Sequence, residues 1–120
     1  MAAEEFPARR RFPRIDSQHS VLLKRLGDEM EEFAQTKTIA VGGCSVVSGE
    51  SIGVGSSLEL LIAVEGGVVT ARGRVTYENE MSDGRFDVGV EFRNLSGEDA
   101  ERIQGVLEKT REEKRRAAGI

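Results

Sequence analysis

The sequence is poor in cysteine, histidine and long apolar runs. Cys44 is the single cysteine, which excludes a disulfide within the chain and favours a reducing compartment such as the cytoplasm. His19 is the single histidine, so neither a histidine-based metal site nor a Ser-His-Asp triad can be assembled. No apolar run approaches the roughly 20 residues that span a bilayer. We therefore expect a cytoplasmic protein that has no membrane span, binds no metal and has no classical catalytic triad.

Positive charge is concentrated in one place, although the formal net charge is −4. Arg9, Arg10, Arg11 and Arg14 lie within six residues near the N-terminus. Proteins that bind duplex DNA are usually basic overall or carry a large basic face. A local basic cluster on an acidic chain instead indicates a small anion or an acidic partner. Binding of single strands on a barrel surface needs stacking aromatics. The chain has five phenylalanines, several of which fit the core pattern, one tyrosine and no tryptophan. Nucleic acid is therefore an unlikely partner.

Fourteen glycines separate short apolar runs, which favours strands joined by tight turns. In the run 30–39 we expect Met30, Phe33 and Ile39 in the core, and in the run 68–77 we expect Tyr77 to share the face of Val75. Strands are predicted over 20–26, 30–39, 44–48, 57–64, 68–77 and 85–92, with turns at Val41-Gly42-Gly43 and Glu65-Gly66-Gly67.

A helix is predicted from Ser96 onward, because Ser96 is a good N-cap and Asp99 follows three residues later. Its apolar stripe has helical spacing and consists of Ala100, Ile103, Val106 and Leu107. The chain is thus divided into a flexible Arg-rich arm over 1–18, a barrel over 19–95 and a helix over 96–117. The predicted fold is mainly β, a small six-stranded antiparallel barrel with a C-terminal α-helix.

The spacing R-x-x-x-R at Arg10 and Arg14 is the first candidate binding motif. Each guanidinium offers a planar fork of donors that matches a phosphate, or the O6/N7 edge of guanine, in bidentate geometry. The competing interpretation is a solvated basic tail, because charged termini are common.

In the order of its segments, the chain resembles the PilZ family. These segments are the arginine arm, strands, Val41-Gly42-Gly43-Cys44, further strands ending in Val88-Gly89-Val90-Glu91-Phe92, and a terminal helix. The resemblance covers about residues 9–108. It implies a bacterial module that binds cyclic di-GMP and is not an enzyme, with an N-terminal arm that closes on the nucleotide. The implied ligand-binding residues on the arm are Arg9, Arg10 and Arg14.

The family's second motif, [D/N]-x-S-x-x-G, aligns with this sequence through Gly43. Thr38 then stands at the acidic position and Ala40 at the serine position. Thr38, Ala40 and Gly43 complete the implied site, although only the glycine matches the motif. Ala40 offers no side-chain polar atom. The resemblance therefore leaves two functions open: a cyclic di-GMP receptor, or an adaptor that binds protein partners in bacterial motility or surface machinery without the nucleotide.

Overall fold

A computed structural model describes residues 15–117 of the chain. In chain order its elements are β1 (Ile15–Asp16), β2 (Ser20–Arg25), β3 (Glu31–Ala40), β4 (Gly43–Ser48), β5 (Ser57–Val64), β6 (Gly67–Glu80), β7 (Phe86–Arg93) and α2 (Gly97–Ala117). Each predicted strand is present with ends that differ by at most three residues, and β5 matches its predicted bounds.

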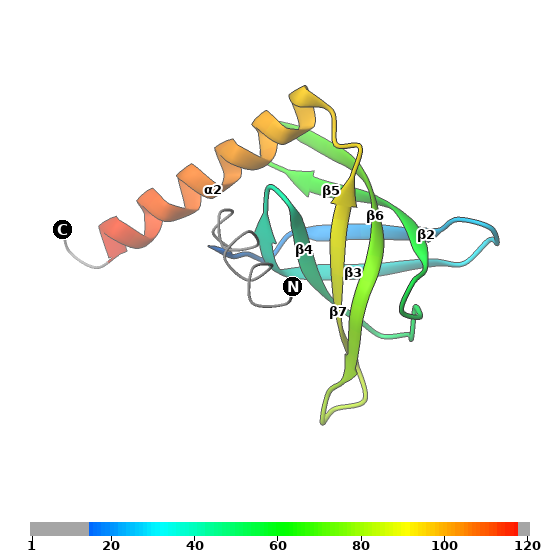
Figure 1. Cartoon of the computed structure of the whole chain (residues 1–120). Coiled ribbons are helices and arrows are strands. Elements are labelled where there is room, and N and C mark those ends of the chain that lie inside the picture. The colour runs from blue at the N-terminus through cyan, green and yellow to red at the C-terminus, as the bar shows by residue number, and fades with distance from the viewer. Residues whose placement is uncertain (1–14, 118–120) are drawn as a thin grey trace, which may run out of the picture.

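Six of the strands form a closed antiparallel barrel. Neighbours follow the order β3-β2-β5-β6-β7-β4, and β4 pairs again with β3 to complete the ring. Closure leaves none of these six strands with a free edge along the ring, which is how small all-β domains avoid edge-to-edge association. The short β1 pairs with the far half of β3 and continues the line of β2 (Figure 1). The predicted fold class is confirmed.

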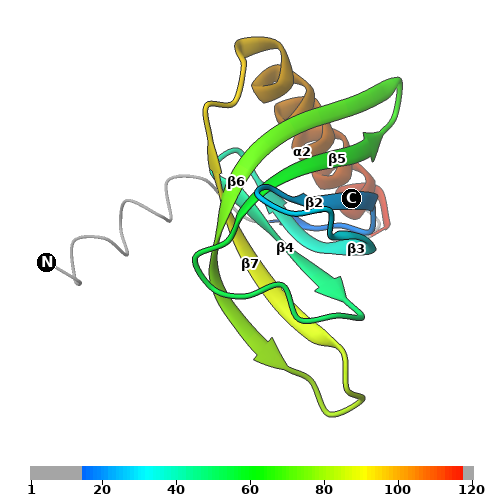
Figure 2. The same ribbon diagram turned by 90° about the vertical axis from the view of Figure 1, so that its right-hand side faces the viewer.

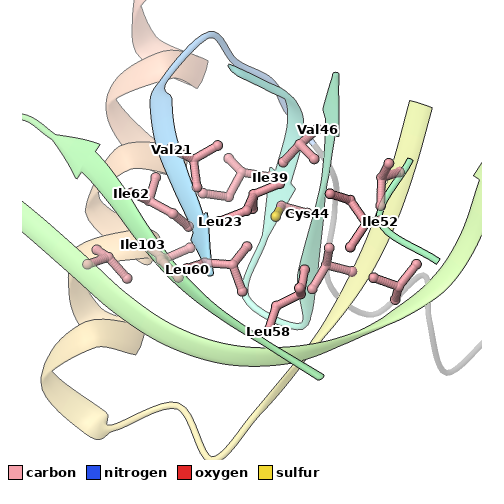
Figure 3. Packing of buried hydrophobic residues seen from close by; sticks show 14 of the residues in the cluster. Val21, Leu23, Ile39, Cys44, Val46, Ile52, Leu58, Leu60, Ile62 and Ile103 are labelled. Atoms are coloured by element: carbon pink, nitrogen blue, oxygen red, sulfur yellow. The ribbon is translucent and has the colours of Figure 1, made fainter. Parts of the chain in front are cut away.

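The core lies inside the barrel and is built from aliphatic side chains of every barrel strand (Figure 3). On β2, β5 and β6 these residues recur every second position, as half-buried strands require. Ile103 and Leu107 of α2 are buried in the same cluster, so the helix closes one end of the barrel (Figures 1 and 2). Full burial of each such side chain stabilises the fold by about 1.5–3 kcal/mol.

The helix begins as the sequence predicts. The Asp99 amide donates to Ser96 Oγ over 3.0 Å, and Ser96 Oγ donates to the Asp99 carboxylate over 2.9 Å. Two polar groups at the helix start therefore satisfy each other, and the acidic side chains of the first turn oppose the positive end of the helix dipole.

The other end of the barrel is closed by the loop between β4 and β5. Ile52 from this loop is buried in the core cluster. Glu78 on β6 holds the loop in place, because its carboxylate accepts hydrogen bonds from Ser51 Oγ (2.6 Å) and from the amides of Ile52 (2.7 Å) and Gly53 (3.1 Å). Burial alone would raise the pKa of Glu78, but these hydrogen bonds together lower it below its ordinary value.

A bulge in β3 makes one core prediction wrong. Thr36 faces Val46 on β4 and Thr38 faces Ser45, so two steps along β3 match one step along β4. An extra residue of this kind reverses which side chains point inward. Before the bulge the even-numbered residues face the core, and Phe33 points outward with 78% of its surface exposed.

A second bulge corrects the predicted face of Tyr77. Val75 lies opposite Val90 in the core, whereas Tyr77 lies opposite Gly89, and the register shifts between them. Tyr77 therefore stands on the outer wall of the barrel, on the face opposite to Val75.

The segment between β1 and β2 is fixed to β3 and does not extend as a free arm. Ser17 Oγ and Thr36 Oγ1 lie 2.7 Å apart, and the His19 amide donates to Thr36 Oγ1 over 2.8 Å. The Thr36 amide in turn donates to the His19 carbonyl over 2.9 Å. Residues 15–19, most of which the sequence assigned to the arm, therefore belong to the barrel wall.

Candidate ligand-binding site

The candidate site lies at the corner where β3 ends and β4 begins. A two-residue turn at Val41 and Gly42 joins these strands, and Ala40 faces Gly43 across it. Both Ala40 and Gly43 are buried. A Cβ at position 43 would overlap the backbone carbonyl of Val90 on β7. Glycine is therefore needed here so that β4 can approach β7 closely.

Thr38 contributes a hydroxyl that already has a partner. Its Oγ1 lies 2.8 Å from Ser45 Oγ, and the two residues face each other across β3 and β4. Thr38 is half-buried and Ser45 is buried. Ser45 is a site residue that the sequence analysis missed. Counting outward from a two-residue turn at Val41 and Gly42 pairs position 38 with position 45, so the signal was present in the sequence.

The N-terminal arm is attached to the barrel at this same corner. Ile15 faces Ile39 and Asp16 faces Thr38, because β1 runs antiparallel to β3. The described chain thus begins one residue along β3 from Ala40. Arg9, Arg10 and Arg14 themselves lie outside the described residues.

One row of residues crosses the outer wall from Thr38 to Tyr77. Ser45 faces Gly89 on β7, and Gly89 faces Tyr77 on β6. A Cβ at position 89 would overlap three carbons of the Tyr77 ring, so the ring lies directly against the backbone of Gly89. Tyr77 is half-buried, and the row therefore joins a pair of hydroxyls to an aromatic ring.

Charges of both signs border this row. Lys37 Nζ lies 3.2 Å from an Asp87 carboxylate oxygen on one side of it. On the other side Glu91 faces both Gly43 and Arg74, and it pairs with Arg93 over 3.5 Å. The floor of the site is neutral, and its hydroxyls can both donate and accept hydrogen bonds. This arrangement offers a polar ligand both hydrogen-bond donors and acceptors.

The rest of the described chain adds no further reactive group to the corner. Cys44 lies in the core cluster, facing away from the outer wall. Within residues 15–117, no group of three histidine, cysteine or acidic side chains is placed to hold a metal ion. The same part of the chain has no helix that is both long and apolar enough to cross a membrane.

Comparison with solved structures finds the same fold in several bacterial proteins. YcgR from Escherichia coli, in complex with c-di-GMP, is 18% identical with a TM-score of 0.78, and the match covers 92% of this chain and 50% of that chain. MrkH from K. pneumonia, also in complex with c-di-GMP, is 21% identical with a TM-score of 0.73, covering 90% and 55%. The Bacillus subtilis inhibitor of motility, MotI/DgrA, is 20% identical with a TM-score of 0.69, covering 83% and 50%.

The chain spans about half the length of these three proteins. No curated protein sequence matches it at a significant level. The sequence model of one family, described as the PilZ domain, matches residues 8–109 and so includes the arginine cluster, every barrel strand and the first part of α2. The chain belongs to the PilZ domain family.

Proposed function

We propose that the chain is a receptor module for cyclic di-GMP, in which the arm closes over the nucleotide at the β3–β4 corner. The observation that carries the proposal is the attachment of the arm at Ile15, opposite Ile39 and beside Ala40. An arm that joins the barrel at this point starts only a few residues away from the motif positions Thr38, Ala40 and Gly43. Two structures with this fold, those of E. coli YcgR and K. pneumonia MrkH, contain c-di-GMP.

The arginines of the arm supply the main attraction for the ligand. Arg10 and Arg14 present two planar forks, and cyclic di-GMP offers two phosphates and two guanine edges that match them. Arg9 adds a further positive charge close to the phosphates. When the arm closes, the surface beside β1 and β3 changes, and a partner protein senses that change.

The corner contributes neutral contacts. Thr38 and Ser45 share one hydrogen bond and retain one O–H donor and several acceptor positions between them. Ala40 offers the ligand no side-chain hydrogen bond, and Gly43 acts only indirectly, by letting β4 pack closely against β7 at the corner. An acid at position 38 and a serine at position 40 would each add a hydrogen bond worth about 1–3 kcal/mol, roughly tenfold to hundredfold in affinity. We therefore expect binding that depends strongly on the arm.

Isothermal titration of the purified chain with cyclic di-GMP tests the receptor function. The wild type should bind, and the double variant Arg10→Ala/Arg14→Ala should lose at least about tenfold in affinity, because two charge-assisted contacts disappear. The double variant Arg102→Ala/Arg111→Ala removes the same charge elsewhere on the surface and should bind like the wild type. A flat titration of the wild type at ligand concentrations well above the micromolar range would refute the proposal.

A second function, an adaptor for a protein partner, is favoured by a different surface. Phe33 on β3 faces Leu22 on β2, and Leu22 faces Leu61 on β5, so these three side chains form an apolar row on the outer wall. Phe33 is 78% exposed. Exposed apolar rows with polar borders are typical of protein-binding surfaces. If this row binds the partner, Phe33→Ser should abolish a cellular motility phenotype while cyclic di-GMP binding stays intact. A Phe33→Ser strain with the wild-type phenotype would rule out the adaptor function of this row.

A further inference from the structure

The outer wall of the hairpin formed by β2 and β3 carries three cross-strand pairs in succession. These pairs are Ser20 with Gln35, Leu22 with Phe33, and Lys24 with Glu31. Their side chains point away from the core, because the residues that alternate with them on β2, Val21 and Leu23, are buried. The hairpin projects beyond the neighbouring strands, so this face is open to another molecule (Figure 1).

The middle pair leaves a large apolar surface in contact with water. Phe33 is 78% exposed, the highest value among the large hydrophobic side chains of the described chain. Leu22 beside it is half-buried, and Leu61 continues the row on β5. Removing such a surface from water favours association with another protein surface.

The charged pair is only loosely closed within one chain. Lys24 Nζ lies 3.8 Å from Glu31 Oε2, which is too long for a hydrogen bond, and both side chains are largely open to solvent. Each can therefore form a shorter contact with a charge from outside. Their support is rigid, because the Arg25 guanidinium at the end of β2 donates to the Asp28 carboxylate and to the Ile52 carbonyl, each over 2.8 Å.

Each of the three pairs is complementary to itself when its order is reversed. A twofold axis that lies between two facing walls, parallel to the strands, places β2 of one copy against β3 of the other. The facing residues are then Lys24 and Glu31, Leu22 and Phe33, and Ser20 and Gln35, and each contact occurs twice. Packed sheets commonly keep their strands within about 30° of each other, so β-sheets allow this arrangement.

We infer that the outer wall of β2 and β3 binds a second copy of this chain, forming a weak symmetric dimer. The inference goes beyond the receptor function, and it gives Phe33 a different partner from the one in the adaptor function. The contact involves a few residues on a convex wall, so we expect a Kd on the order of 100 µM, as for the smallest specific interfaces. Ala40 lies seven residues after Phe33, roughly 23 Å along an extended strand. The corner therefore stays open in both copies.

Sedimentation equilibrium of the chain from about 1 µM to about 1 mM measures the association. The decisive variants are Lys24→Glu and Glu31→Lys, studied singly, combined in one chain, and mixed in equal amounts as two separate chains. Phe33→Ser removes the apolar contact. The control variants, Arg111→Glu and Glu108→Lys, make the same charge changes at exposed positions on α2. Urea unfolding at low concentration, where the chain is monomeric, shows whether each variant is folded.

The wild type should dimerise, and Phe33→Ser and each single charge variant should associate at least about tenfold more weakly. In each single charge variant, like charges face each other twice across the axis. The combined variant and the mixture should both recover association, because opposite charges again face each other. The net charge of −4 changes by two in each single variant, so both chains of the mixture remain acidic and have no general attraction for each other.

A wild type that stays monomeric over the whole range overturns the dimer. An association that Phe33→Ser leaves unchanged also overturns it, as does a mixture of the two folded charge variants that fails to associate. The control variants should dimerise like the wild type, and equal weakening in them would show that overall charge, and not this wall, governs association. A monomeric wild type whose Phe33→Ser variant loses the motility phenotype overturns the dimer and assigns the apolar row to the adaptor function. None of these measurements depends on cyclic di-GMP, so the receptor function stands or fails separately.

Discussion

Replacing Gly43 with alanine is expected to destabilise the barrel by about 2–3 kcal/mol. The new Cβ would overlap the Val90 carbonyl and come within 3.3 Å of the Glu91 Cα, so backbone on both strands would have to move. Overpacking of this kind costs about 1–3 kcal/mol. Separation of β4 from β7 also weakens one or two ladder hydrogen bonds worth about 0.5–1.5 kcal/mol each. Alanine also lowers the conformational entropy of the unfolded chain, and this offsets the destabilisation by about 0.5–1 kcal/mol.

Gly89→Ala is the matched comparison, because it also places a methyl group on the barrel wall, on β7. Here the new Cβ overlaps a side chain, the ring of Tyr77, which can rotate into solvent. We therefore expect a loss of about 1 kcal/mol or less, together with altered tyrosine fluorescence, since Tyr77 is the only tyrosine.

Urea unfolding followed by far-UV circular dichroism measures both losses from the shift in midpoint at constant slope. The test is which of the two variants loses more stability, because both add one methyl group to a glycine in a strand. If Gly43→Ala is as stable as the wild type, or more stable than Gly89→Ala, the close approach of β4 and β7 at the corner is wrong.

Three further variants test other parts of the fold. Gly105→Ala should raise the unfolding free energy by about 0.5–1 kcal/mol in urea, because Gly105 is exposed within α2 and its Cβ would meet nothing within 4 Å. Phe33→Ser should change the unfolding free energy by less than about 0.5 kcal/mol, since Phe33 points to solvent. A larger loss would show that Phe33 packs in the core. The lowered pKa of Glu78 means that its ionised form stabilises the fold above pH 4.5, and that this contribution disappears as pH falls through the folded-state pKa. Glu78→Gln should therefore be less stable than wild type at neutral pH, with the difference shrinking as the pH falls below 4.5 in thermal melts.

The sequence predicts the local elements well, because each has its own signal. Gly66, at the β5–β6 turn, adopts a φ of +86°, which is the conformation its position in a tight turn requires. Ser96 and Asp99 fix the start of α2 through neighbouring contacts. Such features depend on a few adjacent residues and can be recognised without knowing where the rest of the chain lies.

The two bulges could not be predicted in this way. An extra residue in β3 or β6 is defined only against the partner strand, and neither Lys37 nor Thr76 carries a side chain that marks a bulge. Phe33 is assigned to the core by sequence because unbroken alternation from Ile39 would point it inward. The extension of the outer-wall row from Ser45 to Tyr77 has the same origin, since it depends on the register of β4, β7 and β6.

The bulge in β3 also separates the two candidate functions in space. On one side of it, Thr38 and Ala40 lie on the outer face of the strand, at the corner where β1 pairs with β3. On the other side, Phe33 faces outward into the apolar row with Leu22 and Leu61. A strand without the bulge would have turned one of these two surfaces into the core. The proposed nucleotide site and the proposed partner surface are therefore separate on β3, so substitutions can test each of them independently.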